Sequence, residues 1–165
     1  MSAENLQQLL IEELQDLYDA EKQLIKALPK MAAAASNEQL SKGINEHLEQ
    51  TKKQAERLEK AFEILGEKAR SRPCQAMKGL ITEADEHVSE TSDEELVNTV
   101  VIGGGRRIEH YEIAAYSGAI ELAEVTGNDR VAKLLGKTLV EEERTERKLR
   151  QLSSRLLKQT LKEAA

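Results

Sequence analysis

The chain of 165 residues contains very few aromatic residues and a single cysteine. Aromatic residues make up 2% of it, with no Trp, whereas hydrophobic residues as a whole make up 39%. Leu, Ile, Val and Ala must therefore fill the interior, which favours helices packed on helices over a sheet. The lone Cys74 excludes an internal disulfide, and no cluster of Cys and His accompanies it that could form a cysteine-based zinc site. We expect Cys74 to be a buried thiol without a nucleophilic role.

Long apolar runs and an excess of basic residues are also missing. No segment approaches the roughly 20 apolar residues of a membrane span, and the first residues lack the basic and apolar regions of a secretory signal. The formal net charge is -6, with acids and bases interleaved, which argues against an electrostatic footprint for nucleic acid. We therefore expect a cytoplasmic protein with neither a nucleic-acid partner nor a membrane partner.

Capping residues, glycines and apolar stripes divide the chain into four long helical segments. The expected helices run from about Glu4 to Ala35, from Asn37 to Leu65, from about Ser92 to Thr126, and from Asn128 or Asp129 past Leu157. Gly66 and Gly127 are placed to end the second and third of these helices. A chain of this length suits one domain, so residues 1–165 are expected to share one core.

A connection of about 26 residues, from Glu67 to Ser92, separates the second helix from the third. Its amphipathic stretch around Met77, Leu80 and Ala84 predicts a short fifth helix. Short loops make each pair of helices antiparallel, so the long connection must travel the length of the bundle. The sequence thus predicts an all-α, antiparallel four-helix bundle with one long crossover that carries a short fifth helix.

Each long helix interrupts its apolar stripe with polar residues near mid-length. Glu21 takes such a position in the first helix, between Leu17 and Leu28. The other residues at this level are His47, Thr51 and Gln54 with Gln50 at the margin, then Glu109 and Glu112, then Glu142 and Glu146. Any one of them could be a solvated or ion-paired side chain, but their coincidence in all four helices is poorly explained in that way.

A layer of unpaired buried carboxylates would strongly destabilise the fold. Leaving one buried carboxylate unpaired costs several kcal/mol, so the layer should contain a cationic partner. The stripes contain no Arg or Lys unless Arg106 turns inward. A pair of divalent metal ions is the simpler partner, because carboxylates with an imidazole suit iron or manganese.

Four motifs, one in each long helix, resemble the YciF-like family of bacterial proteins. They are LYDAEKQL (17–24), EHLEQT with Gln54 and ERLE (46–59), IEHYEIAAY (108–116) and TLVEEERTERKL (138–149). The resemblance covers nearly the whole chain. It implies a ferritin-like bundle with a dinuclear carboxylate site, a homodimer and an association with bacterial stress, but no established reaction.

Carried onto this chain, the resemblance implies a set of metal ligands for two ions of iron or manganese per chain. These are Glu21, His47, Gln50, Gln54, Glu109, Glu112, Glu142 and Glu146. In the third helix we expect Glu112 to be the ligand, with Glu109 second and His110 beside the site or at an interface. The general ferritin-like motif E-x-x-H is absent, and Gln50 is an amide, which implies weaker binding or a single occupied position.

Three functions fit these features. The first is a metal-dependent redox protein acting on oxygen or peroxide, with Tyr116 or Tyr18 close enough to tune or relay the reaction. It predicts loss of metal when Glu21 and Glu142 are changed to alanine. The second is a non-catalytic helical interaction protein whose polar layer is a vestigial or weak metal site. The third is iron storage in a large shell.

The run Gly103 to Gly105 before Arg106 and Arg107 suggests a phosphate-binding loop. Such a loop needs a preceding strand and a lysine-serine type ending, and the sequence has neither. Glycines in a helix cost about 1 kcal/mol each relative to alanine. Because Ile102 and Gly105 continue the row of Glu109 and Glu112, we expect the helix to pass through, with the glycines as close-packing positions or a weak point.

Overall fold

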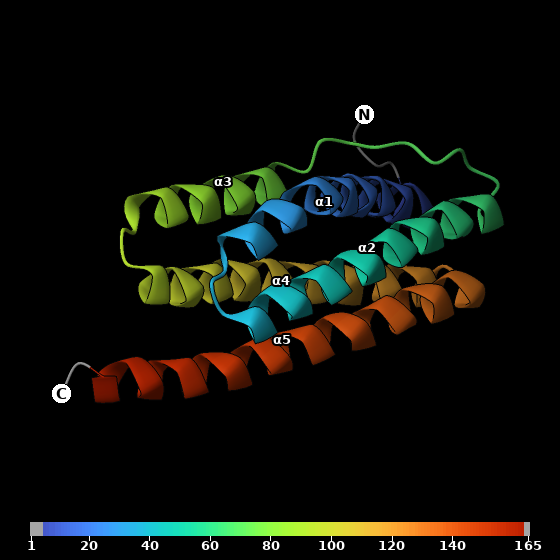
Figure 1. Ribbon diagram of the computed structural model, residues 1–165. Coiled ribbons are helices and arrows are strands. Elements are labelled where there is room, and N and C mark those ends of the chain that lie inside the picture. The colour runs from blue at the N-terminus through green and yellow to red at the C-terminus, as the bar shows by residue number, and fades with distance from the viewer. Residues whose placement is uncertain (1–4, 164–165) are drawn as a thin grey trace.

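The protein is described by a computed structural model over residues 5–163, and within that range it forms five α-helices and no strand (Figure 1). They are α1 (Leu6–Ala34), α2 (Glu38–Ile64), α3 (Gln75–Glu90), α4 (Glu94–Val125) and α5 (Asp129–Glu163). The four long helices and the fifth helix in the crossover are confirmed, although the expected start at Glu4 lies outside the described residues. None of these helices, over residues 5–163, is long and apolar enough to cross a membrane.

Capping groups set the ends of the helices where the sequence marks them. Asn37 and Asp93 precede α2 and α4, and their side chains accept hydrogen bonds from backbone N–H groups of the first turn. Gly66 and Gly127 follow the same two helices with φ of 72° and 74°, a left-handed conformation that glycine adopts without strain. Asn37 and Gly127 thus lie in the two short hairpin loops, whereas Gly66 and Asp93 mark the start and the end of the long crossover.

Two clusters of apolar side chains form the core, and a polar layer lies between them. Along α1 and α5 the chain passes first through the cluster of Leu14 and Leu135 and then through the cluster of Leu28 and Leu152. Helices α2 and α4 pass through the two clusters in the opposite order. Hence α1 and α5 run antiparallel to α2 and α4, as Figure 1 shows and as one long crossover requires.

The crossover returns along the outside of the bundle and ends in α3, which packs on α4 and α1 (Figure 1). The backbone N–H of Arg72 donates to the Gln15 carbonyl at 3.1 Å, which ties the crossover to α1. Helix α4 continues through the triple glycine, and a Cβ added to Gly104 would lie 2.8 Å from the Cβ of Ala84 in α3. Gly104 is therefore a close-packing position that lets α3 approach α4.

Candidate metal centre

The polar layer is assembled from all four long helices at mid-length. Its acidic, imidazole and amide side chains are Glu21 from α1, His47 and Gln54 from α2, Glu109 and Glu112 from α4, and Glu142 from α5, each at most 4% exposed. Glu109 and Glu112 are three residues apart, so both project from one face of α4 into the layer. Polar residues that are far apart in the sequence thus form one buried group, because each lies on the inward face of its helix at the same level.

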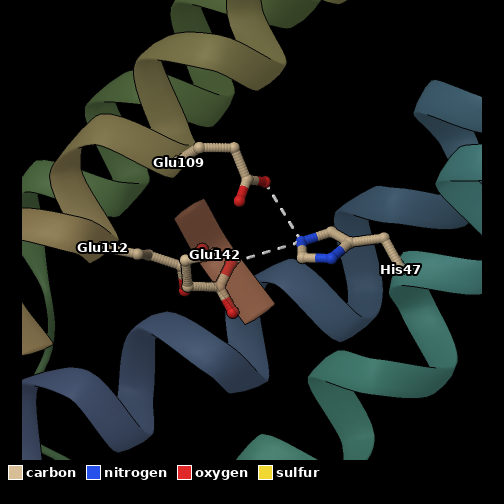
Figure 2. A group of neighbouring side chains, drawn as sticks. All are labelled: His47, Glu109, Glu112 and Glu142. Atoms are coloured by element: carbon tan, nitrogen blue, oxygen red, sulfur yellow. Dashed lines mark ion pairs between the residues drawn. The ribbon is translucent and has the colours of Figure 1, made fainter. Parts of the chain in front are cut away.

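Four of these residues form a compact group in which an imidazole faces three carboxylates (Figure 2). His47, Glu109, Glu112 and Glu142 each offer one ligand atom, and these atoms all lie within 4.8 Å of one another. His47 Nε2 lies 3.1 Å from Glu109 Oε1 and 3.8 Å from Glu142 Oε2. This group could hold a metal ion, and both Glu109 and Glu112 of α4 belong to it.

The layer also contains buried oxygens that have no hydrogen-bond partner. They are Oε2 of Glu21, Oε1 of Gln54, Oε2 of Glu109, both carboxylate oxygens of Glu112, and Oε2 of Glu142. Within residues 5–163, no other fully buried side-chain oxygen lacks a partner. Each such atom costs about 1–3 kcal/mol, and buried polar groups are nearly always paired. The donor set of this layer fits a divalent cation that prefers carboxylate and imidazole ligands.

The layer contains four glutamates and one histidine, so acidic groups outnumber basic groups. Burial raises the pKa of Glu21 to about 8, against the opposing effect of a hydrogen bond from Tyr116. Burial and neighbouring carboxylates also raise the pKa of Glu112 and Glu142 well above the ordinary value. Burial by itself would lower the pKa of His47, but the charge and hydrogen bond of Glu109, with smaller effects of Gln50 and Glu21, together outweigh it and raise the pKa to about 9. Bound protons therefore supply the positive charge that a metal ion would otherwise bring.

Only one of the two tyrosines expected near the site contacts the layer. The Tyr116 hydroxyl donates to Glu21 Oε1, and both side chains are fully buried. The Tyr18 hydroxyl instead donates to Glu59 Oε1 at 2.7 Å near the surface. Tyr116 is thus the residue that orients Glu21.

The two glutamines support the group from α2. The Gln54 amide donates to Glu142 Oε1 and, at 3.1 Å, to Glu141 Oε2. Gln50 Oε1 lies 3.4 Å from His47 Nδ1. Both amides contact residues of the group, so they are placed to orient its carboxylate and its imidazole.

Glu146 lies outside the group, because two other helical residues engage its carboxylate. Arg106 donates to Glu146 Oε1 from Nη2 at 2.8 Å, and His110 Nε2 lies 3.5 Å from the same oxygen. Burial raises the pKa of Glu146, but the hydrogen bonds and charge of Arg106, together with Arg150 and His110, outweigh it, so the net shift is downward. Arg106 therefore neutralises Glu146 at the edge and does not enter the layer.

Sequence reasoning missed an ion pair that braces the site from α2 to α5. Arg57 donates from Nη1 and Nη2 to the two carboxylate oxygens of Glu141, at 2.6 and 2.8 Å. Glu141 is partly buried, because its carboxylate packs against α2. No periodicity within one helix could have found a contact between residues 84 positions apart.

The comparisons with known proteins agree with the motifs. The profile of the family described as "Domain of unknown function (DUF892)" matches residues 5–162. Over 154 residues the chain is 42% identical to Protein YciF of Escherichia coli (strain K12), with 93% of each chain covered. The chain belongs to the YciF-like family.

Solved structures of YciF-like proteins confirm the bundle. The crystal structure of the E. coli stress protein YciF superposes with a TM-score of 0.91 at 40% identity, covering 94% of this chain and 99% of that one. YcfI from Rhodopseudomonas palustris superposes with a TM-score of 0.88 at 41% identity, covering 89% of this chain and 94% of that one. The fold of this YciF-like chain is thus shared along nearly its whole length.

The single cysteine of this YciF-like chain is buried, as expected. Cys74 is 1% exposed at the start of α3, and its Sγ lies 3.0 Å from the Tyr111 hydroxyl. Burial raises the pKa of the thiol. A thiol in this state is a weak nucleophile.

Proposed function

We propose that this YciF-like protein binds divalent iron or manganese in its buried layer and uses the metal in redox chemistry with oxygen or peroxide. The set of unpartnered buried oxygens beside the His47 imidazole is the observation that carries the proposal. The E. coli relative is described as a stress protein, which supports a role of this chain in a stress response.

His47, Glu109, Glu112 and Glu142 would hold one ion, and Glu21 would help to hold a second, weaker one. A bound iron or manganese ion would supply the redox equivalents for a reaction with oxygen or peroxide. The protein's own residues orient the ligands, since Tyr116 holds Glu21 and Gln54 holds Glu142. The apolar clusters on either side exclude bulk water from the layer.

Metal analysis of the purified protein tests this proposal. Protein isolated without chelators from cells replete in iron and manganese should contain roughly one to two ions per chain. The double variant Glu112→Gln/Glu142→Gln should lose them, whereas Glu143→Gln, a neighbour that is exposed on α5, should retain them. Oxidation of the loaded protein by peroxide, followed by absorbance, would then test the redox role. Wild-type protein that stays metal-free and resembles the double variant in stability would contradict the proposal.

A non-catalytic interaction protein is the second function. It is favoured by the Gln54 amide, which already donates to Glu142 from within the layer, and by the absence of an E-x-x-H motif. It predicts that neither iron nor manganese raises the unfolding temperature.

We also propose that the protein is cytoplasmic and that it forms a homodimer, the latter as the family resemblance implies. Sedimentation equilibrium should give twice the mass of the chain. A shell of many chains would instead favour iron storage.

A further inference from the structure

A pocket of about 440 Å³ opens between α2 and α5, next to the polar layer. The buried residues Leu40, His47 and Leu152 form its inner wall, and exposed polar and charged side chains surround its mouth. Its size is in the range of small-molecule sites, which are typically mostly apolar with a few polar groups.

His47 belongs both to this pocket and to the polar layer. Its Nε2 faces Glu109 and Glu142, as Figure 2 shows, whereas its Nδ1 lies 3.4 Å from both Gln50 Oε1 and Thr145 Oγ1. Gln50 and Thr145 also line the pocket. The imidazole is therefore the wall between the pocket and the carboxylates.

Gly43 keeps the α2 side of the pocket open. A Cβ added to Gly43 would meet no heavy atom within 4 Å, and its φ is not in the left-handed region. A glycine inside a helix costs about 0.5–1 kcal/mol relative to alanine, and no close contact in the fold requires this one. Because Gly43 lies one helical turn from both Leu40 and His47, any side chain there would project into the pocket.

The mouth of the pocket is positively charged although the chain as a whole is negative. Lys42, Lys148 and Arg155 line it with a single acid, Glu46, in a protein of formal net charge -6. Apolar surface for a ligand comes from the leucines of α2 and α5, Leu40, Leu149 and Leu152.

We propose that this pocket binds a small amphipathic carboxylate. Its apolar chain contacts Leu40, Leu149 and Leu152, and its carboxylate pairs with the cations of the mouth. Binding itself does not depend on a metal, whereas the position of the ligand next to a metal ion rests on the function proposed above.

Octanoate is the probe, titrated into metal-free protein and followed by calorimetry and by amide shifts of residues in the pocket. We expect one octanoate per chain. Gly43→Leu should weaken binding by about ten-fold or more because the added side chain occupies part of the pocket. Gly118→Leu is the matched control, since Gly118 is also an exposed helical glycine with nothing within 4 Å of an added Cβ, and it should leave the affinity unchanged.

Charge variants separate anion recognition from apolar contact. Lys148→Gln/Arg155→Gln should weaken octanoate binding by about three-fold to ten-fold, whereas Arg147→Gln, exposed on α5 outside the pocket, should not. An octyl ammonium ion should bind more weakly than octanoate to the wild-type protein. Equal binding of the two ions, equal binding by Gly43→Leu, or no binding of octanoate would overturn the proposal. So would a Gly43→Leu chain that changes from dimer to monomer, because the pocket would then belong to an interface.

Mn²⁺-loaded protein tests the position of the ligand separately. Paramagnetic broadening of the bound octanoate signals is expected if the ion lies behind His47. Octanoate that binds without broadening to protein shown to contain Mn²⁺ would overturn the adjacency. Failure of Mn²⁺ to bind would count against the proposed metal function, while the metal-free titrations would still decide the pocket.

Discussion

Glu112 has both carboxylate oxygens buried without a hydrogen-bond partner, a costly arrangement in a metal-free protein. Glu112→Met keeps the length of the side chain and removes its polar atoms. Without metal, the variant should have a free energy of unfolding higher by about 1–3 kcal/mol. Its affinity for Mn²⁺ should fall by at least about ten-fold, since one ligand is lost. Urea unfolding with and without Mn²⁺ measures both effects.

The control for this variant is Glu143→Met, which replaces an exposed acid on α5. It should change the free energy of unfolding by no more than about 0.5 kcal/mol. If Glu112→Met were less stable than wild type in the absence of metal, the buried carboxylate would have a protein partner, and its assignment as a metal ligand would be wrong.

Tyr116 is the second residue whose role can be isolated. Its hydroxyl donates to Glu21 and favours the ionised carboxylate, so Tyr116→Phe should raise the pKa of Glu21 above its value of about 8. The lost hydrogen bond should cost about 1 kcal/mol of stability. A carbon-13 NMR titration of the Glu21 carboxyl group measures the pKa. Tyr18→Phe, which removes a hydroxyl bound to Glu59, should leave that titration unchanged, and an unchanged titration in Tyr116→Phe would contradict the role given to Tyr116.

At the scale of the helices, two neighbouring glycines in α4 have opposite expected effects. A Cβ on Gly104 would lie 2.8 Å from that of Ala84, so Gly104→Ala must push α3 away and should cost about 1–3 kcal/mol. A Cβ on Gly103 meets only the flexible end of Arg107 at 3.7 Å. Gly103→Ala should therefore stabilise the protein by up to about 1 kcal/mol through helix propensity. Thermal and urea unfolding should show that Gly103→Ala is more stable than wild type and that Gly104→Ala is less stable. The reverse order of stability would contradict the close packing of α3 on α4.

The ends of the helices could be predicted from sequence because they depend on local chemistry. Asn37 and Asp93 cap the first turns, and Gly66 and Gly127 adopt the positive φ that ends a helix. Each of these effects acts within a few residues, so the sequence contains all the information needed.

Contacts between helices could not be predicted in the same way. The polar residues at mid-length of each stripe predicted that His47, Glu109, Glu112 and Glu142 lie at one level. They do form one group, because each lies on the buried stripe of its helix. Glu146 lies on the same stripe of α5 and is nevertheless paired with Arg106, outside the group. Which partner a stripe residue meets depends on the axial shift and rotation of neighbouring helices, and the period of a single helix does not determine either.

For the molecule as a whole, the buried layer makes stability depend on pH. The pKa of Glu21 is raised from 4.5 to about 8 and that of His47 from 6.5 to about 9. Between the ordinary and the raised pKa of each group, the folded protein holds a proton that the unfolded chain has released. The stability of metal-free protein should therefore fall as the pH rises from about 5 to about 9. Thermal unfolding in the presence of a chelator measures this trend, and Glu21→Gln should flatten it. A stability that rises across the same range would contradict the raised pKa values.

Metal binding should have the opposite dependence on pH. Carboxylate and imidazole ligands must be deprotonated, so the affinity for Mn²⁺ should increase from about pH 6 to about pH 8, and protons should be released on binding. Calorimetry in two buffers with different ionisation enthalpies counts the released protons. Binding that releases no protons would place the ion at exposed carboxylates and not in the layer.

The most direct test of the central claim is the position of a metal ion in a crystal of the wild-type protein. Crystals grown with Mn²⁺ and measured at the manganese absorption edge should show their strongest anomalous peak between His47, Glu109, Glu112 and Glu142. The peak should disappear in Glu112→Gln/Glu142→Gln and persist in Glu143→Gln. A layer without an anomalous peak, in crystals whose exposed carboxylates bind Mn²⁺, would contradict the account.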